Sequence, residues 1–483
     1  MKTTCSIRGA LCLSALLPAM VSCAGYFFWT GEVDNSFETI TGSGNWKYDN
    51  ASENGTSASY SEATKRLLKD HVVLFKDRSV AFSERFNESG RQVEFSKKFD
   101  LTKKLEISAG SAESPIQFVS VGDATNGVVC ANVFLTSAGY MKALSGEYTF
   151  TQLLVRNGVF ENVGGTFNGT SSLIVGNQYG AGTAVLINRG GAINLAGGIQ
   201  LTSVTGSKDT YDQVTVITNF GGTITATGLE IGSNPQNVKN KSYVGHVTME
   251  GGLMSLSGPV TIGGYNTESC GLYLNGGVLE TTQVVPSRGS GHFVFFNGGT
   301  LRAAANSIRA EFFKVGDGYS FLVGENGGTI DAGGQNIQLD KSLESALVSG
   351  TDGGMTFTGG GKVQVDYFGD KTQVDGLKGG LMYSGPTKIT PGTTVWTVNR
   401  RLAGTVATEG LVCKLTKETY KDGVYTLFEL DATKSDTFTE ADLARCRVEP
   451  ADLASSVKFK LSENKKSILA EVKVKRYFKL IIR

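Results

Sequence analysis

Pairs of adjacent glycines recur through the middle of this 483-residue chain at a nearly regular interval. The first glycines of successive pairs lie between 22 residues (276 to 298) and 31 residues (190 to 221) apart. An interval of roughly 20–50 residues is typical of stacked repeats, because one such unit cannot bury its own apolar side chains without a neighbour. The pairs begin at Gly164, Gly190, Gly221, Gly251, Gly276, Gly298 and Gly327.

The residues around each pair predict a short strand that follows a sharp corner. Apolar residues stand at the second position after every pair and often again two positions later, which is the pattern of a half-buried strand. Asn precedes six of the pairs, and both Asn and Gly tolerate positive φ, so we expect a turn there. The apolar residues at the second position are Phe167, Ile193, Ile224, Met254, Leu279, Leu301 and Ile330.

Composition and period narrow the fold further. The chain has 63 Gly but only 8 Pro, which excludes collagen, and its apolar content of 40% argues against disorder. Helical repeats are excluded because no period of 3.6 residues runs through this region. A β-propeller is disfavoured, because each of its blades needs about 40 or more residues and the interval here is 22 to 31. We therefore predict an all-β, right-handed parallel β-solenoid, whose strands pair with the coils above and below at about 4.8 Å.

The repeats divide the chain into four zones. Residues 1–24 predict a signal peptide, because Lys2 and Arg8 precede an apolar stretch that is short for a membrane span. Residues 25–145 are expected to form an N-terminal cap or β region, and residues 146–398 the solenoid repeats. Residues 399–483, which are charged and poor in Gly, predict a small C-terminal β cap domain.

Two processing routes fit the end of the signal. Cleavage after Ala24 would give plain secretion, with Ser22 and Ala24 as the small pair. Alternatively, the run Met20-Val21-Ser22-Cys23 is similar to a bacterial lipobox, which would attach a lipid to Cys23. The sequence leaves both routes open.

Four cysteines follow the signal, and none has the spacing of a metal ligand. Cys413 and Cys446 could form a disulfide, because export permits disulfides. Buried free thiols are the alternative. The four residues are Cys130, Cys270, Cys413 and Cys446.

Segments outside the repeats predict caps that would protect the open strand edges of a stack. Residues 72–99 alternate apolar and charged residues as a solvent-facing strand does, and a short helix is expected over 61–69. The expected C-terminal elements are strands over 424–430, 457–461 and 467–474, and a helix over 437–445 with Thr437 as its N-cap.

Two segments near the end of the repeats resemble the passenger-associated β-strand repeat of autotransporters. They read GGMTFTGGGKVQV (353–365) and YSGPTKITPGT (383–393), and the NGG units at 275, 297 and 326 are similar to looser repeats of that family. The start around Trp29 and Trp46 is also similar. The resemblance implies an exported right-handed β-helix on or released from a cell surface. Residues 399–483 are too few for the family's C-terminal translocator barrel, so we expect a passenger-like chain that lacks it.

The residues that carry chemistry show no recognisable constellation. His71, His246 and His292 are far apart and are expected to be ordinary strand or surface residues. The acid pairs Asp209/Asp212 and Asp366/Asp370 are expected to lie in turns rather than to catalyse. We therefore expect no catalytic, cofactor-binding or metal-ligating residues, and no cofactor.

Aromatic residues and net charge bear on the partners. Trp29, Trp46 and Trp396 could stack on sugars, but they lie near the predicted ends of the solenoid, where such residues more often plug the core. A net charge of +1 gives no drive toward nucleic acid. We expect a glycan or cell-surface ligand, no nucleic acid, a membrane contact only through a lipid on Cys23, and a monomer.

These observations lead to one function and one alternative. We expect a noncatalytic exported protein, secreted or on the cell surface or outer membrane, with the periplasm as a further location. Its role would be adhesion or envelope structure, through an elongated repetitive face. The alternative is a carbohydrate-active β-helix enzyme, such as a polysaccharide lyase or glycoside hydrolase, which would line a groove with several acidic residues from adjacent coils.

Overall fold

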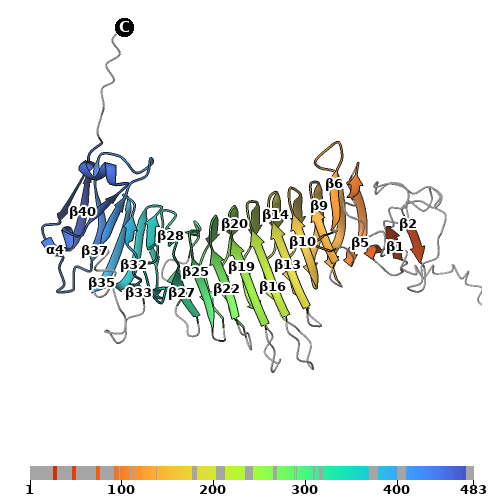
Figure 1. Cartoon of the computed structure of the whole chain (residues 1–483), viewed down its shortest axis with the longest axis horizontal. Helices are drawn as coiled ribbons and strands as arrows, with labels where there is room; N and C mark the ends of the chain where they lie inside the picture. Colours follow the sequence, from red (N-terminus) through yellow and green to blue (C-terminus); the bar gives the residue numbers. More distant parts are fainter. Residues whose placement is uncertain are drawn as a thin grey trace, which may run out of the picture.

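The structure is a computed structural model in which the chain winds into a long stack of coils (Figure 1). The predicted signal peptide, with Cys23, lies outside the residues that it describes. These are 26–29, 46–49, 72–76 and 92–474, without 97, 109–110, 114, 137–138, 177–181, 203–212, 234–242, 265–268, 288, 290, 308–310, 315–318, 369–378 and 400–409.

One coil of the stack contains three strands. In a central coil these are β13 (Gly182–Asn188), β14 (Ala192–Leu195) and β15 (Ile199–Thr202). The next coil repeats them as β16 (Gln213–Asn219), β17 (Thr223–Ala226) and β18 (Leu229–Ser233). Each strand pairs in parallel with its equivalent in the next coil, so the stack is held together by backbone hydrogen bonds between coils.

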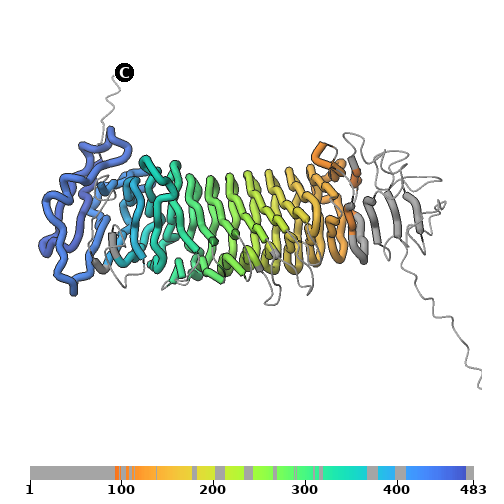
Figure 2. The backbone as a smooth tube through the Cα atoms, turned by 60° about the horizontal axis from the view of Figure 1, so that its bottom comes forward, coloured from red at the N-terminus to blue at the C-terminus, as the bar shows by residue number. Residues whose placement is uncertain are grey.

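The strands form two long sheets, and successive coils of the chain lie side by side along the stack (Figure 2). The first sheet also contains β4 (Gln92–Phe95), β6 (Ile116–Ser120), β8 (Gly139–Ala143), β10 (Gly158–Asn162), β19 (Tyr243–Met249), β22 (Ser269–Leu274), β25 (His292–Phe296), β27 (Tyr319–Val323), β29 (Ile337–Gln338), β30 (Leu343–Ser345), β32 (Gly361–Phe368), β33 (Gly380–Met382) and β35 (Thr393–Asn399).

The second sheet is formed by the other two strands of each coil. It contains β14, β15, β17 and β18, together with β3 (Val72–Lys76), β5 (Lys98–Ser108), β7 (Gly127–Leu135), β9 (Glu147–Val155), β11 (Thr166–Gly169), β12 (Leu173–Val175), β20 (Leu253–Leu256), β21 (Val260–Ile262), β23 (Val278–Thr281), β24 (Val284–Pro286), β26 (Thr300–Ala303), β28 (Gly328–Asp331), β31 (Met355–Thr358), β34 (Thr387–Ile389), β36 (Leu411–Lys414) and β38 (Arg447–Glu449).

The predicted fold, an all-β parallel β-solenoid, is confirmed by the buried rows of the core. All seven apolar residues that follow the glycine pairs, from Phe167 to Ile330, have 0% exposure. They stand opposite one another in successive strands of the second sheet, so each one packs against its equivalents in the neighbouring coils. Local alternation along the sequence therefore becomes a continuous apolar row inside the stack.

The corners between first and second strands use Gly and Asn in different ways. One glycine of most pairs has positive φ, such as +70° at Gly191 and +67° at Gly252. The asparagines do not, because Lys465 is the one residue other than Gly with positive φ among the described residues. The predicted turn is present at these corners, and Asn162 and Asn188 contribute buried side chains to it rather than a positive φ.

Parallel stacking extends toward the N-terminus beyond the glycine pairs. β5 pairs with β7 and β7 with β9, so coils form before residue 146. Aromatic rings fill the core there, with Phe95 stacked on Phe118 at 5.6 Å between centroids. Before them, β1 (Tyr26–Trp29) pairs with β2 (Trp46–Asp49) and with β3. The helix predicted over 61–69 lies outside the described residues.

An antiparallel sheet lies at the C-terminal end, where the sequence predicted the strands of a small β cap. It contains β37 (Gly423–Leu430), β40 (Ser467–Val472) and β39 (Val457–Leu461), and β37 continues the first sheet by pairing in parallel with β35. The N-cap of the short helix α4 (Glu440–Leu443) is Thr439, not Thr437 as predicted. The Asp442 carboxylate accepts hydrogen bonds from the Thr439 backbone and hydroxyl at 2.7 and 2.9 Å, which fixes the start of the helix there. A 3₁₀ turn, η4 (Ala451–Ser456), precedes β39.

The two passenger-like segments lie in adjacent coils and in register. Met355 stands opposite Thr387, and Gly361 opposite Thr393. The Asp352 carboxylate ties their corners together by accepting hydrogen bonds from the backbone N–H groups of Gly354 and Gly385, both at 3.0 Å. The motif therefore describes one coil corner that is repeated in the next coil.

Candidate functional site

A row of polar side chains runs along the outer surface of the second sheet. Each member stands opposite the next one in the register of adjacent strands, so the row crosses eight coils. Neighbours contact one another directly: the Asn194 amide donates to Asn168 at 3.0 Å, and Thr225 donates to Asn194 at 3.2 Å. We call this row the polar ladder; it contains Asn168, Asn194, Thr225, Ser255, Glu280, Arg302, Asp331 and Thr358.

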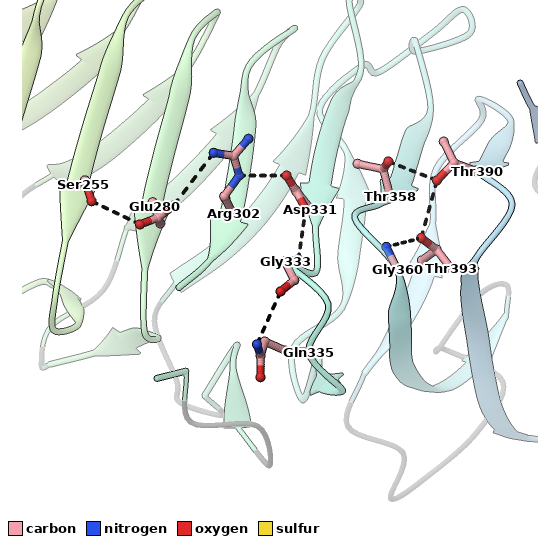
Figure 3. A network of polar contacts seen from close by, with 10 residues as sticks. All are labelled: Ser255, Glu280, Arg302, Asp331, Gly333, Gln335, Thr358, Gly360, Thr390 and Thr393. Carbon is pink, nitrogen blue, oxygen red and sulfur yellow. Dashed lines mark hydrogen bonds and ion pairs between the residues drawn. The ribbon is translucent and has the colours of Figure 1, made fainter. Parts of the chain in front are cut away.

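The one cation of the polar ladder pairs with both of its carboxylates (Figure 3). The Arg302 guanidinium lies 2.8 Å from Asp331 and 3.8 Å from Glu280, and Ser255 donates to Glu280 at 3.1 Å. Asp331 also accepts a hydrogen bond from the Gly333 backbone at 2.9 Å. Because the same cation engages both carboxylates, this arrangement favours a hydrogen-bonding surface over an acid–base pair.

A shallow open groove lies at the corner between the second and third strands. Its volume is about 350 Å³, and the third strands contribute Gln200, Glu230 and Thr261, which stand opposite one another in register. Gly198, Gly228 and Pro259 also line it. The Gln200 amide lies 3.4 Å from the Glu230 carboxylate. The groove and the polar ladder thus present two parallel rows of hydrogen-bonding groups, one on each side of the same corner.

The histidines and acid pairs do not assemble into a site. The Cys270 backbone donates to Nδ1 of buried His292 at 3.2 Å, whereas His246 lies two strands away and faces outward. Asp366 accepts a hydrogen bond from the Gly379 backbone at 3.3 Å. No group of three His, Cys, Asp or Glu that could hold a metal occurs in the part of the chain that the structure describes. His71, Asp209, Asp212 and Asp370 lie outside that part.

Trp396 lies on the outer surface of β35 instead of in the core. It is half-buried between the buried residues Val395 and Thr397, and it stands opposite Gln364 and Glu429. The expectation that it plugs the solenoid is therefore wrong, because the alternation of β35 directs Val395 and Thr397 inward. The side chains of Trp29 and Trp46 lie outside the description, although their backbones pair.

Cys413 and Cys446 are free thiols in this structure. Cys413 stands opposite Val448, so Cys446 lies two residues before the position opposite Cys413, directly ahead of β38. Burial raises the pKa of both thiols to about 12, so both stay protonated and unreactive near neutral pH.

The outer surface of the first sheet is mostly apolar, in contrast to the polar ladder. From β13 to β27 its outward side chains include no Asp, Glu, Lys or Arg, although 19% of the chain is charged. Tyr273 packs edge-to-face against Phe293 at 5.1 Å and against His246 at 5.3 Å. We call the outward surface of β13, β16, β19, β22, β25 and β27 the apolar face.

An ion cluster marks the N-terminal border of the apolar face. The Glu161 carboxylate is 3% exposed and accepts hydrogen bonds from Arg189 at 2.5 Å and from Tyr140 at 2.7 Å. Burial opposes its charge, but these hydrogen bonds and Lys142 outweigh burial and lower the pKa of Glu161. The cluster is internally satisfied, so we assign it a structural role.

Sequence reasoning missed the groove, the polar ladder and the apolar face. Each is assembled from positions one coil apart, and reading outward positions at the repeat interval would have shown the rows. The chain matches no protein-family model, no curated protein and no solved structure. Among the described residues, no helix is both long and apolar enough to cross a membrane.

Proposed function

We propose that this protein is an exported, noncatalytic β-solenoid that binds an extended glycan along the corner of its second sheet. The observation that carries the proposal is the pair of parallel polar rows beside the groove, one with Gln200, Glu230 and Thr261 and the other in the polar ladder. Coils repeat at about 4.8 Å. A linear polymer of hydroxyl-rich units could therefore meet similar donors and acceptors at successive coils.

The proposed setting is a cell surface or the extracellular medium, in adhesion or envelope structure. The predicted signal peptide and the resemblance to autotransporter passengers support it. The adjacent, in-register coils of 353–365 and 383–393 agree with that resemblance. A lipid on Cys23 would supply the membrane contact.

The alternative is a carbohydrate-active enzyme. Hydrolysis of a glycosidic bond generally requires two carboxylates on either side of it. Glu230 is the one carboxylate among the residues that line the described groove, and Glu280 and Asp331 are both engaged by Arg302. We therefore favour binding over cleavage.

The test combines binding and cleavage on a panel of plant, microbial and mucosal polysaccharides. We expect retention on at least one polymer without new reducing ends or unsaturated products. Replacing Gln200 and Glu230 together by Ala should weaken retention about tenfold or more, because hydrogen bonds to charged groups contribute about 1.5–3 kcal/mol. Replacing Gln117 and Glu94 together by Ala is the matched control, because it removes the same two residue types from the first sheet outside the apolar face. Cleavage of any polymer would establish the enzyme instead.

A further inference from the structure

The apolar face has the composition of a protein interface. Its outward side chains are mainly branched aliphatic residues and aromatic rings, such as Val185, Val216, Val244, Phe293 and Phe295, each partly exposed. Sugar sites need several placed hydrogen-bonding groups, and here Thr and Ser hydroxyls, Tyr273 and His246 are the polar groups available. Contiguous exposed apolar surfaces of this kind mark sites of association.

The size of the apolar face matches what a stable dimer needs. Six strands about 4.8 Å apart, with five to seven residues at about 3.3 Å each, present roughly 29 Å by 17–23 Å. That is about 500–650 Å² on each copy, or about 1,000–1,300 Å² for two copies, which reaches the size of specific interfaces. Flat sheet faces also pack on one another readily, at about 10 Å.

We infer that the apolar face is the interface of a homodimer in which two solenoids pack face to face and run in opposite directions. A two-fold axis parallel to the strands, between β19 and β22, makes the interface isologous and overlaps all six strands of the apolar face, with β16 of one copy against β25 of the other. Val216 is in register with Phe293 across the sheet, so it then faces the partner's Phe293, and a small aliphatic side chain meets a large ring. If the two solenoids ran in the same direction, the rings of β25 would face the same rings of the partner.

The dimer is independent of the proposed glycan binding. The groove residues Gln200 and Glu230 lie on β15 and β18 of the second sheet, whereas the apolar face belongs to the first sheet. Each copy would keep its own groove open. The dimer replaces the monomer that we expected from the sequence, where no outward row had yet been identified.

The first experiment measures the mass of the full exported protein by light scattering and sedimentation over a wide range of concentration. The 483-residue chain, predicted signal peptide included, has a mass of 51.2 kDa, and we expect twice the mass of the exported chain. A monomer throughout the range would overturn the inference. Retention of a glycan that Phe293→Ser abolishes, without any dimer, would assign the apolar face to sugar binding instead.

Variants locate the interface. Val185→Lys should give monomers, while Ala192→Lys, which places the same charge outward on β14 of the same coil, should leave the dimer intact. A dimer of Val185→Lys would overturn the inference. Phe293→Ser is the second variant, because it removes ring area without adding charge. It should also give monomers, and their circular dichroism spectrum should match that of the wild type if the fold is intact.

A charge swap tests the direction of packing. Phe293→Glu alone should give monomers, but the double variant V216K/F293E should recover dimers that dissociate in high salt. Within one chain the two residues lie three strands apart, about 14 Å, so the new charges can pair only between copies. Failure to recover dimers would overturn the antiparallel arrangement.

Discussion

Three asparagines at successive corners form a buried hydrogen-bonded stack. Asn162 donates to Asn188 at 3.0 Å, and Asn188 donates to Asn219 at 2.8 Å, with all three side chains 0% exposed. Met249 and Leu274 occupy the same position in the next two coils, so the corner accepts either amides or apolar groups. An amide without its hydrogen-bond partner would destabilise this corner, because burying an unpaired polar group costs free energy.

Asn188→Ala should therefore lower the free energy of unfolding by about 1–3 kcal/mol, because it leaves Asn219 without its donor and opens a cavity. Urea denaturation would measure the loss. Asn194→Ala is the matched control, since that residue belongs to the partly exposed polar ladder and should change stability by about 0.5 kcal/mol or less. Equal effects of the two variants would contradict a special role for the buried stack.

His246 should make stability depend on pH. Burial lowers its pKa from the ordinary value of 6.5, and the groups around its ring, Tyr273 and Phe293, carry no charge. The folded state thus favours the neutral ring, while the unfolded chain takes up the proton first. Stability should fall as pH drops below 6.5. The wild type should lose more stability than His246→Phe between pH 7.5 and 5, and parallel pH profiles would refute the assignment.

At the scale of the element, the corner glycines set how closely coils stack. Gly252 has a φ of +67°, and a Cβ there would lie 2.2 Å from the Gly222 carbonyl oxygen in the coil before. Both backbone conformation and space therefore demand Gly at this corner. Gly334 has a similar φ of +76°, but a Cβ there would meet nothing within 4 Å.

Substituting these two glycines separates the energetic cost of a left-handed backbone conformation from the cost of a steric clash between coils. Gly334→Ala should destabilise by about 1 kcal/mol, from the left-handed backbone alone. Gly252→Ala should cost at least twice as much, because the coils must also move apart. Thermal unfolding monitored by circular dichroism measures both. If the two variants were equally stable, coil contact would not be what requires Gly252.

At the scale of the whole molecule, the stack behaves as a one-dimensional array. Each coil contacts its neighbours, so local stability depends on what covers each end. The C-terminal sheet is the described cover: β40 lies between β37 and β39, and Ile468 of β40 is 0% exposed. The first sheet therefore continues through β37 and β40 to β39, and the edge strand at this end belongs to the cover rather than to a coil.

Ile468→Ala should destabilise the C-terminal cover by about 2–5 kcal/mol through the cavity that it creates. Because coupling passes only between neighbouring coils, the effect should be local. Amide hydrogen exchange should accelerate in β35 and β37 and remain unchanged in β13 and β16. Uniform acceleration along the stack would show that the protein unfolds as one cooperative unit.

The sequence by itself determined the coil. Glycine pairs at a regular interval located the corners, and the alternation after them identified core residues such as Phe167 and Met254, because inward and outward positions follow from the geometry of a single strand. The C-terminal strands were also predicted correctly, for the same local reason.

Tertiary structure alone decided what the outer surfaces became. Arg302 meets Glu280 and Asp331 only after three coils align, and the charge-free apolar face exists only where strands far apart in sequence lie in register. Trp396 could be placed near an end of the stack but not assigned to its outer surface. Register between coils depends on the number of residues in each turn and on long-range hydrogen bonds, and a local pattern contains neither.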